Sequence, residues 1–352
     1  MKSTVTTKVP VAFEELAARL RVEVDSMLRS WLAPRVERAR QTGPDVEIMA
    51  GAVRDLTLRG GKRLRAILLV STFDACGGDG GIEAVGPAAV AIELLQTYLL
   101  IHDDWMDDDD VRRGGPSVPA VMRARFPEHA DEASILAGDL AAAWARGAMM
   151  EVDLEPSRVV AAARELSRVE QAVVEGQWLD VRGLASDIAS VEAGLALKTS
   201  SYTTSGPISM GALLAGADES TVSALVDFAE PLGIAFQLRD DLLDVFGDAT
   251  IMGKPVGRDL RKGKRTSIVL DAMGDSAARD VIASVWGRAD ASDADLTRVG
   301  RVLEASGARE RSERRIGRLV EEARASLSRA HLTREGRDLL LQGAMALTER
   351  GI

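Results

Sequence analysis

Two aspartate-rich strings, 137 residues apart, constrain this chain more than any other feature of its sequence. Each reads Asp-Asp-x-x-Asp, at residues 103–107 and 240–244. Apolar sequence leads into both strings, which predicts that each lies on a buried helix, where residues four apart share a face. Carboxylates crowded in this way repel one another unless cations lie among them, and Mg²⁺ typically takes one or two carboxylates together with water and phosphate oxygens. Two such helices facing each other would grip a diphosphate through several Mg²⁺ ions.

The acidic run continues past the first string, because Asp108, Asp109 and Asp110 follow Asp107. Taken alone, such a run is most often a solvated turn. A calcium-binding loop is a second alternative, but its D-x-[DN]-x-[DN]-G pattern with a closing Glu is absent. The second aspartate string favours a metal site, and the role of the three additional aspartates stays open.

Basic, glycine-rich sequence supplies candidate partners for an anion. The segment Arg59-Gly60-Gly61-Lys62-Arg63-Leu64-Arg65 precedes an apolar run. Its glycines allow the backbone to approach an anion closely, and a helix beginning near Lys62 would direct its positive end to the same place. Lys62 and Arg65 would then share a face and bind phosphate oxygens. Because a solvated helix start has the same composition, this segment needs support from elsewhere in the chain.

That support comes from three further basic segments: Arg112-Arg113, Lys198-Thr199, and the stretch 253–266, which contains Lys254 and Lys264. Cations beside acidic metal sites suit a diphosphate, because the metal and the cations together neutralise a leaving group. The acidic clusters and the lack of interleaved aromatic residues argue against a nucleic-acid surface.

Long helical patterns dominate the 352 residues, for example at 89–107, 131–152 and 159–181, while alternating β-branched runs are scarce. The stretch 266–270 resembles a short strand, but its surroundings favour helix. Pro231 predicts a kink or a helix start before Gln237. With no linker or repeat in view, the sequence predicts an N-terminal tail over 1–10 and one all-α domain over 11–352.

The formal net charge of −10 is unfavourable for nonspecific binding to nucleic acid or anionic membranes. We expect no stable membrane insertion, since apolar stretches look shorter than the roughly 20 residues of a membrane span. The N-terminus lacks the apolar core of a signal peptide. Cys76 is the single cysteine, so no internal disulfide can form, and a cytoplasmic location is expected.

Six motifs carry a family resemblance, in this order: GGKRLR at 60–65, the first aspartate string with RRG at 112–114, EGQWLD at 175–180, KT at 198–199, FQLRDDLLD at 236–244 and GKPVGRDLRKGKRT at 253–266. Over about residues 45–275 the chain resembles the trans-prenyltransferases of the polyprenyl synthetase family. The resemblance implies an isoprenoid synthase-type bundle of about ten core helices around a central cavity, usually paired as a homodimer.

The resemblance also implies roles for individual residues. Asp103, Asp107 and Asp240 would coordinate about three Mg²⁺ ions that hold an allylic diphosphate, with Asp104, Asp241 and Asp244 in supporting positions. The same diphosphate would be bound by Arg112, Lys198, Lys254 and Lys264. The diphosphate of isopentenyl diphosphate would be held by Lys62, Arg65, Gln96 and Arg113. Thr199 and Gln237 would stabilise the carbocation through their oxygen dipoles, and Lys198 is the third residue assigned to catalysis.

The implied reaction is ionisation of a dimethylallyl, geranyl or farnesyl diphosphate, condensation with isopentenyl diphosphate, and proton loss to give an all-trans chain five carbons longer. A bulky residue four or five positions before the first string is expected to stop elongation. Those positions hold Leu99 and Tyr98, and one aromatic residue in place of two favours a C20 geranylgeranyl product over a C15 farnesyl product.

Two alternatives stay open. A class I terpene cyclase also uses Asp-Asp-x-x-Asp, but it would carry an NSE/DTE-type second motif and lack the GGKR segment. A non-catalytic prenyltransferase subunit would typically lose one aspartate string, whereas both are intact here.

Overall fold

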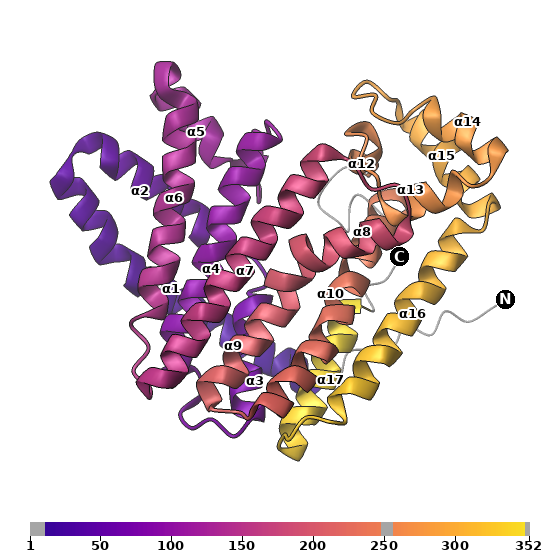
Figure 1. Cartoon of the computed structure of the whole chain (residues 1–352). Helices are drawn as coiled ribbons and strands as arrows, with labels where there is room; N and C mark the ends of the chain where they lie inside the picture. The colour runs from indigo at the N-terminus through magenta and orange to yellow at the C-terminus, as the bar shows by residue number, and fades with distance from the viewer. Residues whose placement is uncertain (1–10, 248–255, 349–352) are drawn as a thin grey trace.

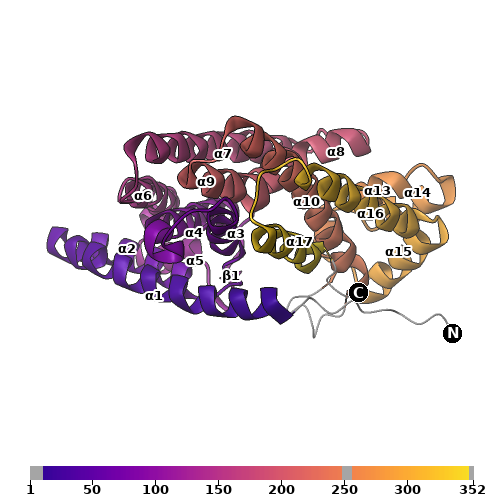
Figure 2. The same ribbon diagram turned by 90° about the horizontal axis from the view of Figure 1, so that it is seen from below.

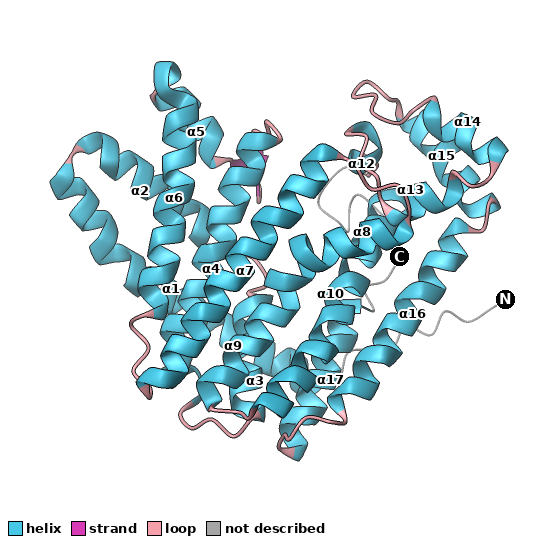
Figure 3. Cartoon of the chain, viewed as in Figure 1, coloured by secondary structure: helices cyan, strands magenta, loops and turns pink. Residues whose placement is uncertain are grey.

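The computed structural model describes residues 11–247 and 256–348, and helices make up most of this part of the chain (Figures 1 and 3). The predicted all-α fold is therefore confirmed. The first helices are α1 (Val11–Thr42), α2 (Pro44–Leu58), α3 (Leu64–Ala75) and α4 (Gly81–Met106). Seen from below, α1 lies along one face of the molecule and α7 along the opposite face, with α3 and α4 between them (Figure 2).

A short antiparallel hairpin follows α4, in which Val111 pairs with Pro116 and Arg112 with Gly115. The two strands of the hairpin are β1 (Val111–Arg112) and β2 (Gly115–Pro116). The helices that follow are α5 (Val118–Arg125), the 3-10 helix η1 (Pro127–His129) and α6 (Ala130–Met149). Ser117 begins α5, because its hydroxyl accepts a hydrogen bond from the backbone N–H of Ala120.

The middle of the chain forms α7 (Pro156–Arg182), α8 (Ile188–Leu195), the π-helix η2 (Ala196–Ser205), α9 (Gly206–Ala215) and α10 (Glu219–Phe246). Asp187 and Ser190 form a reciprocal capping box at the start of α8. Pro231 lies inside α10, so of the two predicted alternatives, a kink or a helix start, the helix start is excluded.

The C-terminal part consists of α12 (Arg258–Arg261), α13 (Ser267–Ala272), α14 (Ser276–Ala283), α15 (Asp293–Ala305), α16 (Ala308–Leu327) and α17 (Arg334–Thr348). The ambiguous stretch 266–270 is helical from Ser267 onward, as the surrounding sequence favoured, and Thr266 is the residue before the helix. Helices α12 to α15 gather at the upper right of Figure 1, beside α8 and the end of α16. The predicted tail 1–10 lies outside the described residues.

Packed apolar side chains connect these groups of helices. From α3, Ile67 and Phe73 join the N-terminal core, while Leu68 packs with Phe228 of α10. Farther along α10, Leu242 joins a third cluster formed with the C-terminal helices. Because α3 and α10 each contribute to more than one cluster, the ends of these two helices are held in fixed relative positions.

Helix α4 is the most central element of the N-terminal part, in contact with α1, α2, α3, α5 and α6. By length and composition it is apolar enough to cross a membrane, with a mean hydropathy of 1.6, which the sequence-based expectation of shorter apolar stretches missed. However, 72% of that window is buried inside the protein. A helix that is apolar on all sides is typical of a core position, which explains the composition of α4.

Candidate active site

The first aspartate motif lies at the C-terminal end of α4. Asp103 and Asp104 belong to the last turn, and Asp107 caps the helix by donating its backbone N–H to the Asp103 carbonyl at 2.9 Å. The helix dipole places partial negative charge at this end, so carboxylates here are unfavourable without nearby cations. The Asp104 side chain is fully buried, whereas those of Asp103 and Asp107 remain about 31% and 27% exposed.

The second motif occupies the last two turns of α10, so both motifs lie at the negative ends of helices. Asp241 and Asp244 are buried. The Gln237 amide donates to Asp241 Oδ1 at 2.9 Å, and the backbone N–H of Asp259 donates to Asp244 Oδ2 at 3.1 Å. Burial, reinforced by neighbouring carboxylates, raises the pKa of Asp241 to about 8. A nearby cation would therefore favour the ionised form of this motif.

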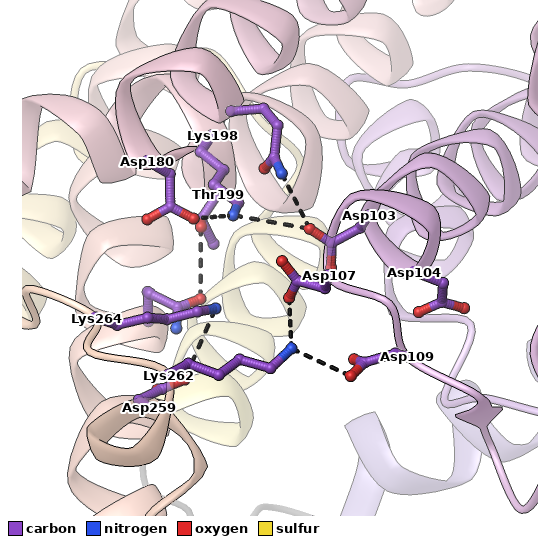
Figure 4. Close-up of polar contacts among 12 residues, drawn as sticks. Asp103, Asp104, Asp107, Asp109, Asp180, Lys198, Thr199, Asp259, Lys262 and Lys264 are labelled. Atoms are coloured by element: carbon purple, nitrogen blue, oxygen red, sulfur yellow. Dashed lines mark hydrogen bonds and ion pairs between the residues drawn. The ribbon is translucent and has the colours of Figure 1, made fainter. Parts of the chain in front are cut away.

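Three lysines, from η2 and from the segment after α12, lie beside carboxylates of the first motif and of neighbouring segments (Figure 4). Lys198 forms an ion pair with Asp180 of α7 and lies 3.9 Å from Asp103 Oδ1. Lys262 Nζ lies 2.7 Å from Asp107 Oδ2.

Lys264 Nζ lies 3.7 Å from Asp259 Oδ1. Burial lowers the pKa of Lys264, but Asp259, Asp180 and the first motif outweigh burial and raise that pKa overall. The positive charge of Lys264 also lowers the pKa of Asp241, so Lys264 interacts with carboxylates of both motifs.

Arg112 of β1 binds the buried carboxylate of Asp104. Its Nε donates to Asp104 Oδ1 at 2.7 Å, and its Nη2 lies 3.8 Å from Asp103 Oδ2. Burial raises the pKa of Asp104 to about 6, although Arg112 acts in the opposite direction. Asp104 Oδ2 has no hydrogen-bond partner among the described residues. Asp104 thus fixes Arg112, and it lies apart from the lysines that approach Asp103 and Asp107 (Figure 4).

A separate pocket of about 170 Å³ brings together the four residues that the resemblance assigned to one diphosphate, namely Lys62, Arg65, Gln96 and Arg113. Helix α3 begins at Leu64, which confirms the predicted helix start near Lys62. Lys62 itself lies just before the helix, so it and Arg65 do not converge through a shared helical face.

The guanidinium of Arg65 donates to Thr203 Oγ1 at 2.9 Å and lies 4.2 Å from the ring centroid of Tyr202, both in η2. The Arg113 guanidinium donates to the Gly60 carbonyl at 2.8 Å. The pocket is therefore strongly cationic and suits an anion.

The π-helix η2 positions Lys198 and Thr199. A Cβ at Gly176 of α7 would lie only 2.7 Å from the Lys198 Cα, and a Cβ at Gly233 of α10 would lie 2.5 Å from the Ser200 Cβ. The two glycines thus allow α7 and α10 to close on η2 from both sides. The Thr199 hydroxyl donates to the Gln237 side-chain oxygen at 3.4 Å, so the two residues assigned to carbocation stabilisation are adjacent.

Tyr98 and Leu99 lie on α4 below the first motif, and both are partly buried against the N-terminal core. The ring of Tyr98 meets that of His102 edge to face, with centroids 4.8 Å apart. His102 in turn contacts the Ile135 carbonyl of α6 at 3.1 Å. Tyr98 therefore faces α6, whereas Leu99 lies one turn before Asp103 on the same side of α4.

Sequence reasoning missed several residues that the structure brings into the site. Gln177 donates to Asp103 Oδ1 at 3.2 Å, and Asp180, Asp259 and Lys262 form the ion pairs described above. All four fall inside the EGQWLD and GKPVGRDLRKGKRT motifs, so the motifs were found but the contacts within them were not. Lys254, assigned to the allylic diphosphate, lies outside the described residues.

The carboxylates of the two motifs suit a magnesium ion whose remaining ligands come from substrate and water. Within residues 11–247 and 256–348, no group of three or more His, Cys, Asp or Glu side chains is close enough to hold one ion by itself. Mg²⁺ is ordinarily bound through one or two carboxylates with water and substrate phosphate completing its octahedral shell. Two carboxylate motifs beside three lysines match that arrangement better than a site made only of protein ligands.

Comparison with known proteins agrees with this geometry. Residues 46–303 match the family described as polyprenyl synthetase. The chain is 36% identical to a geranylgeranyl diphosphate synthase of Methanosarcina mazei, over 65% of this chain and 69% of that protein. It is 38% identical to a farnesyl diphosphate synthase of Geobacillus stearothermophilus, over 59% of this chain and 69% of that protein.

A crystal structure of geranylgeranyl pyrophosphate synthase from Corynebacterium glutamicum, complexed with isoprenyl diphosphate and magnesium, superposes with a TM-score of 0.87 at 32% identity, covering 94% of this chain and 98% of that one. Sequence and fold thus agree over most of the molecule, and we conclude that the chain belongs to the polyprenyl synthetase family and is a prenyltransferase of the isoprenyl diphosphate synthase type.

Proposed function

We propose that the protein condenses isopentenyl diphosphate with an allylic diphosphate to give a short-chain, all-trans prenyl diphosphate. The observation that carries this proposal is that the structure holds two charged sites of different kinds, each of which suits a diphosphate. One combines the carboxylate motifs of α4 and α10 with lysines, and the other is the cationic pocket beside α3. A reaction between two diphosphates, only one of which ionises, requires two sites that differ in this way.

The allylic diphosphate belongs at the carboxylate motifs. Asp103, Asp107 and Asp240 are proposed to hold about three Mg²⁺ ions, with Asp104, Asp241 and Asp244 as supporting carboxylates. When bound, the metal neutralises the departing diphosphate. The cations assigned to the same diphosphate are Arg112, Lys198, Lys254 and Lys264. Of these, Arg112, Lys198 and Lys264 lie beside carboxylates in the described part of the chain.

Isopentenyl diphosphate belongs in the cationic pocket, where Lys62, Arg65, Gln96 and Arg113 would bind its diphosphate. Arg65 lines this pocket, and its Nε is buried with no hydrogen-bond partner among the described residues. Thr199 and Gln237 adjoin the carboxylate motifs and present oxygen dipoles to the cation that ionisation would create.

We propose a C20 product in preference to C15, on the basis of Tyr98 as the single aromatic residue of the pair below the first motif. The relatives named for geranylgeranyl and farnesyl products are similarly close in identity, so product length has to be measured. The cyclase alternative does not explain a second cationic pocket, and the non-catalytic alternative does not explain two intact aspartate motifs.

A homodimer is proposed through α6 and α7. Val174, Trp178 and Val181 share one side of α7, with side chains 50%, 58% and 55% exposed, and Leu136 of α6 is 54% exposed. The two helices are joined by the ion pair of Arg146 with Glu170 at 2.8 Å. Large apolar side chains exposed together on one side of a helix are typical of an interface.

We also propose that the chain from residue 11 onward is one domain and that it works in the cytoplasm.

The deciding experiment incubates the purified protein with Mg²⁺, labelled isopentenyl diphosphate and each allylic primer, and then resolves the products by chain length. Asp103→Ala and Asp240→Ala should each reduce turnover by about 100-fold or more, because each removes a proposed ligand from the group that stabilises the leaving diphosphate. Full activity in the presence of a chelator, or in either variant, would falsify the proposed mechanism.

A further inference from the structure

The three aspartates that follow the first motif do not act as one acidic run. Asp108 and Asp110 both turn away from the site and bind Arg123 of α5, each at 2.8 Å. Their side chains remain 85% and 69% exposed. Asp108 has a left-handed backbone with a φ of 53°, a conformation that Asp tolerates better than most residues. The reversal at Asp108 separates the direction of Asp109 from that of its two neighbours.

Asp109 faces the opposite way, and its side chain is only 18% exposed. Its carboxylate contacts three cations, one from its own side of the site and two from across it. These are Arg112 of β1 at 3.5 Å, Arg258 of α12 at 3.0 Å and Lys262 at 3.1 Å. Asp109 therefore connects the end of α4 to the segment that also carries Lys264.

Lys262 is shared between two carboxylates (Figure 4). Its ammonium lies 2.7 Å from Asp107 Oδ2 and 3.1 Å from Asp109 Oδ1. Asp107 is a proposed magnesium ligand, and Lys262 lies on one of its two carboxylate oxygens, so a metal at Asp107 would lie close to the ammonium. An ammonium and a divalent cation on one carboxylate repel each other, which favours a shift of Lys262 toward Asp109.

We infer that Asp109 is a positioning residue that retains Lys262 when metal takes Asp107. The exchange needs little movement, because the ammonium is already within hydrogen-bond distance of both carboxylates. After the exchange, the pair of Lys262 with Asp109 still joins the two sides of the site and keeps Lys264 close to the diphosphate. This inference rests on the proposed metal role of Asp107.

The two partners should affect metal binding in opposite directions. In Asp109→Asn, Lys262 has no second carboxylate, so metal binding at Asp107 leaves an ammonium unpaired beside a divalent cation and metal affinity falls. In Lys262→Met, the competitor for Asp107 is removed and metal affinity rises. A partly exposed ion pair of this type corresponds to about a threefold change in a binding constant.

The test measures equilibrium binding of Mn²⁺, used in place of Mg²⁺, to the full-length protein with inorganic diphosphate present to complete the metal shell. Binding is followed from the loss of the free-ion electron paramagnetic resonance signal, relative to the same Mn²⁺ and diphosphate mixture without protein. Asp109→Asn should raise the dissociation constant about threefold or more, and Lys262→Met should lower it. The matched controls Asp108→Asn and Asp110→Asn remove the same charge from the same loop, and they should stay within about twofold of wild type. Asp109→Asn is then introduced into the Lys262→Met variant. There it should change the free energy of Mn²⁺ binding by less than half of the change that it causes in the wild-type protein.

Equal effects of Asp109→Asn and Asp108→Asn would overturn the inference. So would an Asp109→Asn effect that keeps its full size in the Lys262→Met background, because Asp109 would then act as a nearby charge and not through Lys262. Mn²⁺ binding that Asp103→Asn leaves unchanged would instead overturn the proposed metal site, and the inference with it.

Discussion

At the scale of single residues, Lys62 and Arg65 show how two anion-binding side chains reach one pocket from different local structures. Arg65 lies inside α3, while Lys62 belongs to the loop before it. Both line the pocket together with Arg113. Their convergence results from the path of the glycine-containing loop, in which Gly60 and Gly61 have φ angles of 87° and 125° that other residues rarely adopt.

We expect Lys62→Ala and Arg65→Ala to raise the KM for isopentenyl diphosphate about tenfold or more, because each removes a charge-assisted contact to a phosphate. The KM for the allylic primer should change much less. Steady-state kinetics with each substrate varied in turn measures both values, and Arg123→Ala, outside the pocket, is the control. A selective loss of primer affinity in both variants would show that the two diphosphate sites are assigned the wrong way round.

A second prediction at this scale concerns product length. Tyr98→Ala removes a large ring from a packed wall between α4 and α6, so the space below the first motif should deepen. Chromatography of labelled products should then show chains at least one isoprene unit longer. Tyr98→Phe keeps the ring and should keep the wild-type product. If Tyr98→Ala also leaves the products unchanged, another helix forms the floor.

The sequence identified most of the charged residues of the site but not their partners. Motif residues such as Asp103 and Lys198 are recognisable because each stands in a local pattern. The pair of Lys262 with Asp109 spans 153 positions, and Asp180 meets Lys198 across 18 positions and two helices. Such contacts depend on how helices pack, and local sequence carries no information on that packing.

At the scale of secondary-structure elements, the long helices were predictable because their apolar periodicity extends over several turns. The patterns at 89–107, 131–152 and 159–181 correspond to α4, α6 and α7. The π-helix η2 was not predictable, because its wider turns depend on tertiary contacts with two other helices. Continuation of α10 through Pro231 has the same kind of cause, since α10 packs along η2, α9 and α16.

Gly176→Ala tests the role of close packing against η2. A methyl group at this position would overlap the backbone of Lys198, so the π-helix has to shift and carry Lys198 and Thr199 with it. We expect a loss of about 1–3 kcal/mol in the free energy of unfolding, together with a lower kcat. Denaturant unfolding and initial-rate kinetics measure the two effects.

Gly194→Ala is the matched control, because nothing lies within 4 Å of a Cβ at that position in α8. It should leave both quantities close to wild type or slightly raise stability, since alanine favours a helix over glycine. Equal behaviour of the two variants would mean that η2 does not depend on the contact with α7.

At the scale of the whole molecule, the proposed dimer makes a direct prediction. Light scattering should give a mass of about twice the 37.6 kDa of one chain. Introducing charge into the apolar face of α7 with Val174→Glu and Trp178→Glu together should shift the protein to monomer, since burial of two unpaired carboxylates opposes association. Val22→Glu, at a residue that is 68% exposed on α1, should leave the mass unchanged. A monomeric wild type would refute the proposed interface.

The negative ends of α4 and α10 meet at one site in a chain that already carries a net charge of −10. Without ligand, lysines must balance that charge. A bound metal and diphosphate complete the balance, and any ligand that binds only the folded state stabilises it, by about 2.7 kcal/mol at one hundred times its dissociation constant. We therefore expect the lifetime of this protein in a cell to follow the supply of its own substrates, so that scarcity of isoprenoid precursors also speeds removal of the enzyme that consumes them.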